Sequence, residues 1–329
     1  MTTTDVPTGA DAGHALEDLL EAHRRELTGY CYRMLGSPAE AEDAVQETML
    51  RAWQRIDAFE GRASLRTWLY RIAHNVCIDM HRSPQRRARP MDLGPSTPRA
   101  QAQLGEPRDE HAWVMPIADE AVVGGDGDPA AVAESRESIR LAFVAAVQHL
   151  PPKQRTALIL CEVLKWKAAE AAALLETSTA SINSALQRAR ATMASLQGEP
   201  LDPVDQPEHA AFVERWLDAW HRYDVDELVS MMRDDVVLSM PPFDLWLTGP
   251  DDVAGWFLNE GAGCRGGRLV PIALNGTAGF GNYKLVRPGL WEPFGIQVVE
   301  VSGGQVVGHH NFLYPDRFTD YGLPARLEG

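Results

Sequence analysis

Arginine side chains gathered in one short stretch are the chain's clearest candidates for binding chemistry. Between residues 62 and 89 a single acidic residue, Asp79, accompanies Arg62, Arg66, Arg71, Arg82, Arg86, Arg87 and Arg89. Guanidinium groups bind phosphates, and aromatic or amide side chains beside them can stack on or hydrogen-bond an unpaired base. The residues that this chemistry selects are Arg62, Ser64, Arg66, Arg71 and Asn75. An ordinary arginine-rich surface helix is the alternative.

An amphipathic helix precedes this basic stretch. Helical spacing predicts a buried side that contains Val45, Met49, Ala52, Trp53 and Ile56. The opposite side then carries Asp43, Gln46, Glu47, Leu50 and Gln54. This side is either a solvated acidic face or a docking surface for a basic partner helix, with Leu50 as its apolar anchor.

A second group of polar side chains follows the pattern of a helix-turn-helix. Pro151-Pro152 begins one helix, residues 167–175 form a short second one, and Ser178 can cap a third. A helix of this kind can place its outer side chains in the major groove of DNA. The candidates are Thr179, Ser181, Asn183, Ser184, Gln187, Arg188 and Arg190. A plain helical hairpin is the alternative.

Aromatic residues are frequent in the last third of the chain. They could line an apolar ligand pocket, for which we select Trp216, Trp220, Met240, Trp246 and Trp256, or they could simply fill a core. Asp244, His309 and His310 are the candidates for a general base there, but no pattern brings them together. We therefore expect no catalytic residue, no enzyme activity, no metal site and no cofactor. The four cysteines form no CxxC pair.

These side chains belong to a multi-domain chain of 329 residues. We expect two all-α domains followed by an α+β domain. The predicted parts are a disordered segment (1–13), a helical domain (14–83), a flexible linker (84–133), a helix-turn-helix domain (134–197), a hinge (198–207) and the α+β domain (208–329). A hairpin turn is predicted at Gly303-Gly304.

The overall charge limits the function. The net charge is −15, which argues against a protein that binds DNA by itself, because non-specific affinity depends on neutralising phosphates. The basic stretch suits a subunit that meets DNA only when docked on a larger assembly. No apolar run is long enough to cross a membrane, and the first residues lack the features of a secretory signal, so we expect a cytoplasmic protein without membrane contact.

Two sequence segments resemble a known family. The consecutive stretches DAVQETMLRAW and FEGRASLRTWLYRIAHNVCIDMHR are similar to the σ2 domain of extracytoplasmic-function (ECF) sigma factors of the sigma-70 family, which direct core RNA polymerase to promoters. The resemblance implies that Asp43, Gln46, Glu47 and Leu50 contact the β′ clamp helices. It also implies that Arg62, Ser64, Arg66, Arg71 and Asn75 hold the melted −10 element.

Residues 150–195 resemble the σ4 domain, which reads the −35 element in the major groove and binds the β flap of polymerase. Here Glu176 occupies a turn position where glycine is usual, and Asn183 and Ala185 replace frequent basic residues. With fewer cations, promoter reading would depend more on Asn and Gln hydrogen bonds to base edges.

The last part of the chain resembles the SnoaL-like (NTF2-like) cone fold, as in the SigG-type group of sigma factors. The resemblance implies regulation in cis, with a small ligand or an anti-sigma protein as further partners. Two other interpretations remain open. One is a ligand-responsive helix-turn-helix repressor that binds duplex DNA without polymerase. The other is a SnoaL-type enzyme fused to a DNA-binding module.

Overall fold

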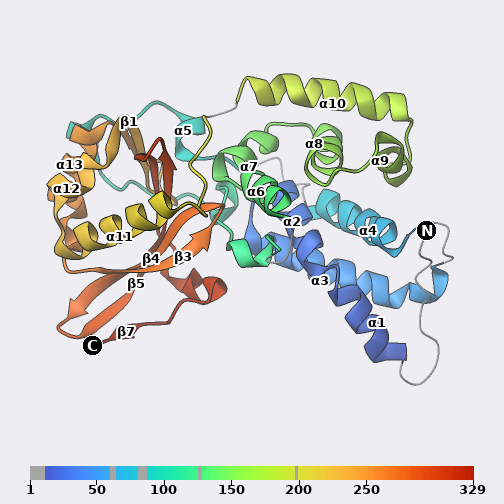
Figure 1. Ribbon diagram of the computed structural model, residues 1–329, viewed down its shortest axis with the longest axis horizontal. Helices are drawn as coiled ribbons and strands as arrows, with labels where there is room; N and C mark the ends of the chain where they lie inside the picture. The colour runs from blue at the N-terminus through green and yellow to red at the C-terminus, as the bar shows by residue number, and fades with distance from the viewer. Residues whose placement is uncertain (1–11, 60–63, 81–86, 125–127, 197–198) are drawn as a thin grey trace. The chain divides into compact units, whose positions relative to one another are not determined.

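The chain folds into two compact units. The computed structural model describes residues 12–59, 64–80, 87–124, 128–196 and 199–329. The first unit comprises residues 1–86 and 120–197, and the second comprises residues 87–119 and 198–329 (Figure 1). Helices make up the first unit, and a sheet with covering helices makes up the second. The predicted combination of all-α and α+β parts is therefore confirmed.

The first unit begins with four helices, α1 (Ala12–Glu21), α2 (Arg24–Leu35), α3 (Pro38–Gln54) and α4 (Leu65–Met80). Helix α2 ends at Gly36, whose φ of 76° is left-handed and suits glycine. Ser37 then caps α3 by accepting a hydrogen bond from the Glu40 amide, and Pro38 occupies the first turn. These local signals explain why the chain turns at residues 36–38.

Six further segments complete this unit: α6 (Pro129–Glu137), α7 (Leu141–Gln148), α8 (Pro152–Leu158), the π-helix η5 (Ile159–Val163), α9 (Ala168–Leu174) and α10 (Thr179–Ala194). Ser178 caps α10 by accepting from the Ser181 amide at 3.1 Å. Glu176 has a φ of 50°, a left-handed conformation that explains the usual preference for glycine in this turn. In Figure 1, α10 lies across α8 and α9, which is the predicted helix-turn-helix arrangement.

Arg155 joins the two helical groups of this unit, which are α1 to α4 and α6 to α10. Its side chain is 1% exposed. Nη1 donates to the Met34 carbonyl at 2.5 Å and to Gln148 Oε1 at 2.8 Å. Nη2 donates to the carbonyls of Gln148 and Leu150 at 2.9 and 3.3 Å. A single guanidinium thus binds α2, α7 and the start of α8 together.

The second unit is built on one curved sheet. Its strands are β1 (Met232–Ser239), β2 (Trp246–Thr248), β3 (Arg268–Leu274), β4 (Thr277–Arg287), β5 (Leu290–Ser302), β6 (Gln305–Phe312) and β7 (Leu327–Glu328). The order is β2-β1-β6-β5-β4-β3, with β7 beside β5. All pairs are antiparallel except β1 with β6. Gly303 and Gly304, both with positive φ, form the predicted hairpin turn between β5 and β6.

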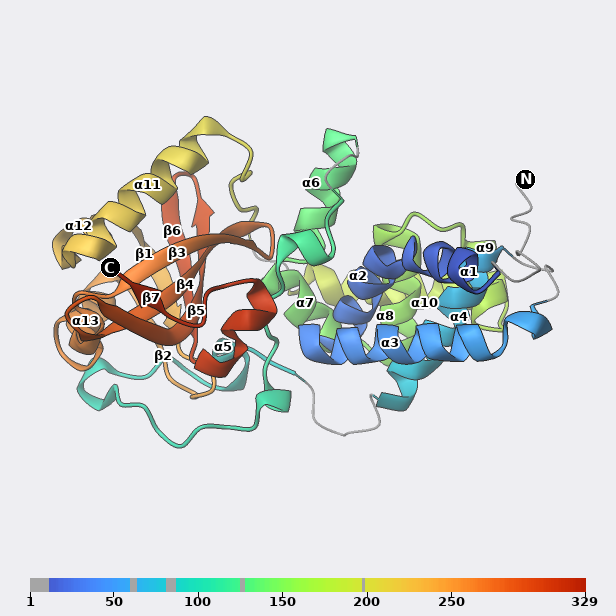
Figure 2. The same ribbon diagram turned by 90° about the horizontal axis from the view of Figure 1, so that it is seen from below.

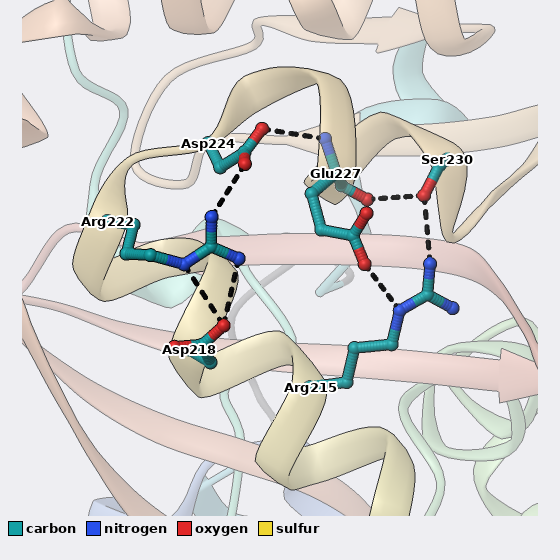
Figure 3. Close-up of polar contacts among 6 residues, drawn as sticks. All are labelled: Arg215, Asp218, Arg222, Asp224, Glu227 and Ser230. Atoms are coloured by element: carbon teal, nitrogen blue, oxygen red, sulfur yellow. Dashed lines mark hydrogen bonds and ion pairs between the residues drawn. The ribbon is translucent and has the colours of Figure 1, made fainter.

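Helices cover one face of this sheet. Helix α11 (Pro207–Arg222) lies along the sheet, followed by α12 (Val225–Ser230) and later by α13 (Pro250–Leu258) (Figure 2). Ion pairs fix the corner between α11 and α12 (Figure 3). Arg222 binds Asp218 at 2.8 Å and Asp224 at 2.7 Å, and Arg215 binds Glu227 at 2.6 Å. With these charges outward, Trp216 and Trp220 of α11 face the core.

Most of the segment predicted to be a flexible linker (84–133) is not a free linker in the structure. Residues 87–119 belong to the second unit. Ala102 lies in the same core as Trp216 and Trp220. Ile117 and Asn275 exchange two hydrogen bonds of 2.9 and 3.1 Å, and Asp119 accepts from the Gly276 amide at 2.9 Å. The segment therefore packs along the second unit, although its Pro and Gly content is typical of a linker.

The predicted hinge is also attached to the second unit. Asp202 accepts hydrogen bonds from the amides of Gly303 and Gly304 at 2.9 and 2.7 Å. Its own amide donates to the Val301 carbonyl at 2.7 Å. The described part of this segment, from residue 199 onward, is held against the β5–β6 turn. The predicted disordered segment falls mostly outside the described residues, and α1 begins at Ala12.

Candidate functional site

One side of α3 is exposed and carries both acidic and apolar side chains, and its Glu47 pairs with Arg51 at 2.6 Å. Small residues fill the buried side, namely Ala41, Ala44, Val45, Thr48 and Ala52. The exposed side, which we call the α3 face, consists of Asp43, Gln46, Glu47, Leu50, Trp53 and Gln54. Trp53 was predicted to be buried, but it is 54% exposed, and Leu50 is 48% exposed. The four predicted contact residues therefore share this face with a tryptophan that the helical pattern assigned to the core.

The predicted −10 residues on α4 have different surroundings. Arg62 lies outside the described residues. Ser64 accepts a hydrogen bond from the Thr67 amide at 3.2 Å, which caps the helix. Asn75 is exposed and therefore accessible to a nucleotide.

Arg66 and Arg71 instead contact other parts of the first unit. Arg66 pairs with Glu26 at 2.7 Å, and its guanidinium lies 5.1 Å from the ring centroid of Trp166. Arg71 Nη2 donates to the Ala173 carbonyl of α9 at 3.1 Å. In this conformation both side chains hold α4 against neighbouring segments.

The outer side of α10 is an exposed polar surface of the helix-turn-helix. Thr179, Asn183, Ser184, Gln187, Arg188 and Arg190 are exposed, and Ser181 is partly exposed. Arg188 donates to Ser184 at 2.6 Å, and Arg190 pairs with Glu162 of η5. The opposite side of α10 packs inward through Ile182, Ala185, Leu186, Ala189 and Met193. The structure thus places all seven predicted −35 residues at least partly in solvent.

Four of the five predicted pocket residues meet in the core of the second unit. Trp216, Trp220, Met240 and Trp256 belong to one buried cluster. Trp246 is placed differently. It pairs with Ser239, whereas Leu247 and Leu238 pair on the face that contains the cluster, so Trp246 points to the other face. Its Nε1 donates to the Gly94 carbonyl of the predicted linker at 3.1 Å.

The candidate general bases do not converge. Asp244 is 53% exposed and pairs with Arg108 at 2.5 Å. His309 is fully buried between the rings of Trp216, Trp220 and Phe257. His310 faces Ser239 at 2.8 Å and Glu300 at 3.4 Å. No acid–base pair is assembled from these three residues.

His309 should make the protein less stable in acid. Burial, with a smaller contribution from His310, lowers the pKa of His309 to about 3. An unfolded histidine has a pKa of about 6.5, so between these values the unfolded chain binds the additional proton and stability falls as the pH falls. We expect the His309 contribution to decrease below pH 6.5 by up to about 1.4 kcal/mol per pH unit. Urea unfolding at several pH values should show a shallower dependence for His309→Leu, whereas Phe257→Leu, which changes the same core without removing a titratable group, should keep the wild-type dependence.

Two structural features are absent from the described part of the chain. Its His, Cys, Asp and Glu residues form no group of three or more that could hold a metal ion. None of its helices is both long and apolar enough to cross a membrane.

Comparisons with known proteins identify the family. Residues 19–87 match the family described as Sigma-70 region 2, and residues 140–193 match Sigma-70, region 4. The chain is 38% identical over 313 residues to the ECF RNA polymerase sigma factor SigG of Mycobacterium tuberculosis, covering 93% of this chain and 83% of the relative. The chain is an ECF sigma factor. As a sigma factor, it acts in transcription with core RNA polymerase and promoter DNA.

The sigma factor also resembles SigJ of Mycobacterium tuberculosis. The sequences are 28% identical over 328 residues, covering 93% of this chain and 94% of the relative. The crystal structure of SigJ, 24% identical, covers 94% of this chain and 99% of that chain with a TM-score of 0.59, so the fold is shared. The chain is further similar to a snoal-like protein of unknown function from Burkholderia thailandensis, 20% identical, covering 34% of this chain and 99% of that chain with a TM-score of 0.27. The expected family is confirmed, and the SigJ structure supports the predicted fold of helical domains followed by an α+β domain.

Proposed function

We propose that the sigma factor binds core RNA polymerase through the α3 face, with the β′ clamp helices as the contact. The observation that carries this proposal is the exposure of Leu50 and Trp53 among acidic side chains. Burying two large apolar groups against a partner supplies binding free energy, and the carboxylates select a basic partner. Within the described part of the chain, about half of each of these two side chains remains open to solvent.

We further propose two DNA-reading surfaces, both acting in the cytoplasm where the polymerase works. Asn75, with Arg62, Ser64, Arg66 and Arg71, would hold the melted −10 strand. The outer side of α10 would read the −35 element, with Asn183 and Gln187 suited to base edges. Because Arg66 and Arg71 contact neighbouring segments, their use on DNA requires these segments to separate from α4. The helical region of residues 150–195 would also bind the β flap of polymerase.

Reconstituted transcription tests this function. The purified full chain is mixed with core RNA polymerase, and the start sites on a genomic fragment library are mapped. Initiation at discrete promoters, absent with core enzyme alone, is the expected result. Sequence-specific duplex binding by the chain without polymerase would favour the repressor interpretation and count against the proposal.

We also propose that the second unit regulates the sigma factor in cis by holding residues 87–119. In a sigma factor this segment connects the two promoter-reading regions, so its attachment restricts how they engage polymerase. Ile117, Asn275, Asp119 and Gly276 form the attachment. The enzyme alternative gains nothing from the separated positions of Asp244 and His309.

Asn275→Gly should loosen this attachment selectively. Glycine tolerates the left-handed φ of 51° at this position but cannot accept the hydrogen bond from the Ile117 amide. We expect faster hydrogen exchange at residues 115–119 and a changed transcript level from the same promoter. Gly303→Asn, at an open position with a φ of 60°, serves as the control and should leave both unchanged. An unchanged transcript level despite faster exchange would contradict regulation through this segment.

A further inference from the structure

Four cations of the second unit have no carboxylate partner. Residues 199–329, all of which the structure describes, contain nine Lys and Arg residues and twenty Asp and Glu residues. Five of the nine cations form ion pairs with carboxylates, namely Arg215, Arg222, Arg233, Arg317 and Arg326. The other four form none, although acidic residues are in the majority there. We call these four the basic patch, which consists of Arg265, Arg268, Lys284 and Arg287.

The fold brings the basic patch together. Its first two members lie at or just before the start of β3, and the other two lie near the end of β4. These strands are antiparallel neighbours, in which Arg268 pairs with Tyr283, the residue before Lys284. A Cβ atom added at Gly263 would lie 3.0 Å from Lys284 Nζ, so the loop before β3 touches the end of β4. The three arginines of the patch are exposed and can therefore reach a partner.

Aromatic rings, in place of carboxylates, hold three of these cations. The Arg268 guanidinium lies 4.1 Å from the ring centroid of Trp291, and Lys284 Nζ lies 4.9 Å from that of Phe294. Arg265 lies over a third ring at 5.2 Å. A ring face attracts a cation but, unlike a carboxylate, does not cancel its charge. A guanidinium stacked in this way keeps its N–H edge available and is already ordered before it meets an anion.

The surroundings leave the positive charge of the patch uncompensated. Glu292 lies opposite Lys284 in the register of β4 and β5, but the two form no ion pair. Burial and the charge of Arg268 lower the pKa of His221, as expected beside a cation that no acid neutralises. In a chain of net charge −15, a basic surface kept clear of the chain's own carboxylates attracts anions from outside.

We propose that the basic patch binds the phosphate backbone of duplex DNA immediately upstream of the stretch that α10 reads. This inference rests on the −35 function proposed for α10. Phosphate contacts made by Lys and Arg carry no sequence information, so the patch adds affinity without selecting bases. Trp291 and Tyr223, which lie under two of the cations, are only 8% and 7% exposed and do not offer ring faces to unpaired bases. Duplex DNA is therefore favoured over single-stranded DNA.

The length of the chain keeps the second unit close to the DNA that α10 binds. Eight residues lead from Ala194, at the end of α10, to Asp202, which accepts hydrogen bonds from the β5–β6 turn. Even fully extended, they span no more than about 30 Å. This is less than one turn of duplex, which is about 34 Å long. The −10 element, on the downstream side, is assigned to the first unit, so the upstream side is open to the second.

Two promoter fragments test the proposal with holoenzyme assembled from the full chain and core polymerase. Both carry a promoter identified by reconstituted transcription. One fragment ends at the upstream border of the −35 element, and the other continues upstream by about 20 base pairs, or two turns of duplex. We expect the longer fragment to bind at least about fivefold more tightly, with a steeper dependence of affinity on salt concentration.

Substitutions in the patch decide whether its charges cause this difference. Arg265→Gln combined with Arg287→Gln should remove most of the advantage of the longer fragment and reduce the slope of log affinity against log salt by about 2. Arg265→Lys combined with Arg287→Lys keeps the charge and should keep the advantage. The matched control is Arg215→Gln combined with Arg222→Gln, because these arginines are exposed in the same unit but already paired with carboxylates. This control should bind both fragments as the wild type does.

Three results would overturn the proposal. The first is equal binding of the two fragments by the wild-type holoenzyme. The second is an equal loss in the control variant, which would reduce the effect to net charge. The third is weaker binding of the glutamine variant to core polymerase without DNA, which would assign the patch to a protein surface, with the exposed Val286 as its apolar contact. If no start site is found in reconstituted transcription, the function proposed above fails as well, whereas discrete start sites with equal fragment binding remove this inference alone.

Discussion

Replacing Trp53 with alanine is expected to weaken binding of the sigma factor to core RNA polymerase by at least about thirtyfold. Trp53 is 54% exposed and follows Leu50 by one helical turn. Tryptophans at the centre of an interface often contribute about 2 kcal/mol or more, because a large rigid ring is buried at low entropic cost. Adding Leu50→Ala should weaken binding further.

The measurement is a titration of core polymerase with labelled protein at a fixed salt concentration. Leu258→Ala is the matched control, since Leu258 is 55% exposed but lies on α13 of the second unit. Trp53→Ala should leave the free energy of unfolding within about 0.5 kcal/mol, because the position is a surface one. Wild-type affinity in the Trp53 variant would exclude the α3 face as the polymerase contact.

Replacing Arg155 with methionine is expected to destabilise the first unit by at least about 3 kcal/mol. The substitution keeps much of the apolar volume but removes hydrogen bonds to Met34, Gln148 and Leu150. Their oxygens would remain buried without a donor. Because Arg155 joins α2 to α7 and α8, its loss should also loosen the contact between the two helical groups.

Urea unfolding followed by circular dichroism measures this effect. Arg188→Met is the control, because Arg188 is exposed on α10 in the same unit and should change stability by about 0.5 kcal/mol or less. A small effect of Arg155→Met would mean that the helical groups are held together by apolar packing alone. Hydrogen exchange in α2 and α7 would locate the loosening.

Local signals made the helices of the first unit predictable. Gly36, Ser37 and Pro38 mark the start of α3, and Ser178 marks the start of α10. The burial of single side chains was harder to predict. Trp53 was assigned to the core by its spacing. The buried side of α3 instead consists of alanines, a valine and a threonine, because α3 packs closely against its neighbours through small side chains.

Long-range contacts explain what the sequence did not predict. The segment 87–119 has a linker-like composition, yet Ile117 bonds to Asn275, 158 residues away. Trp246 was grouped with the pocket because nothing in a three-residue strand indicates which face it occupies. Pairing with β1 decides this, and a shift of one residue would reverse it.

The attachment of residues 87–119 also has a consequence for synthesis of the protein. Asp119 leaves the ribosome 157 residues before its partner Gly276. At roughly 5–20 residues per second, this interval lasts about 8–30 s. In the later part of that time, once α10 has ended at Ala194, the helices of the first unit are made, whereas Gly276 does not yet exist. A nascent chain therefore passes through a stage in which the helices of the first unit are complete but residues 87–119 are not yet attached to the C-terminal sheet; under the regulation proposed above, the sigma factor is unregulated at that stage.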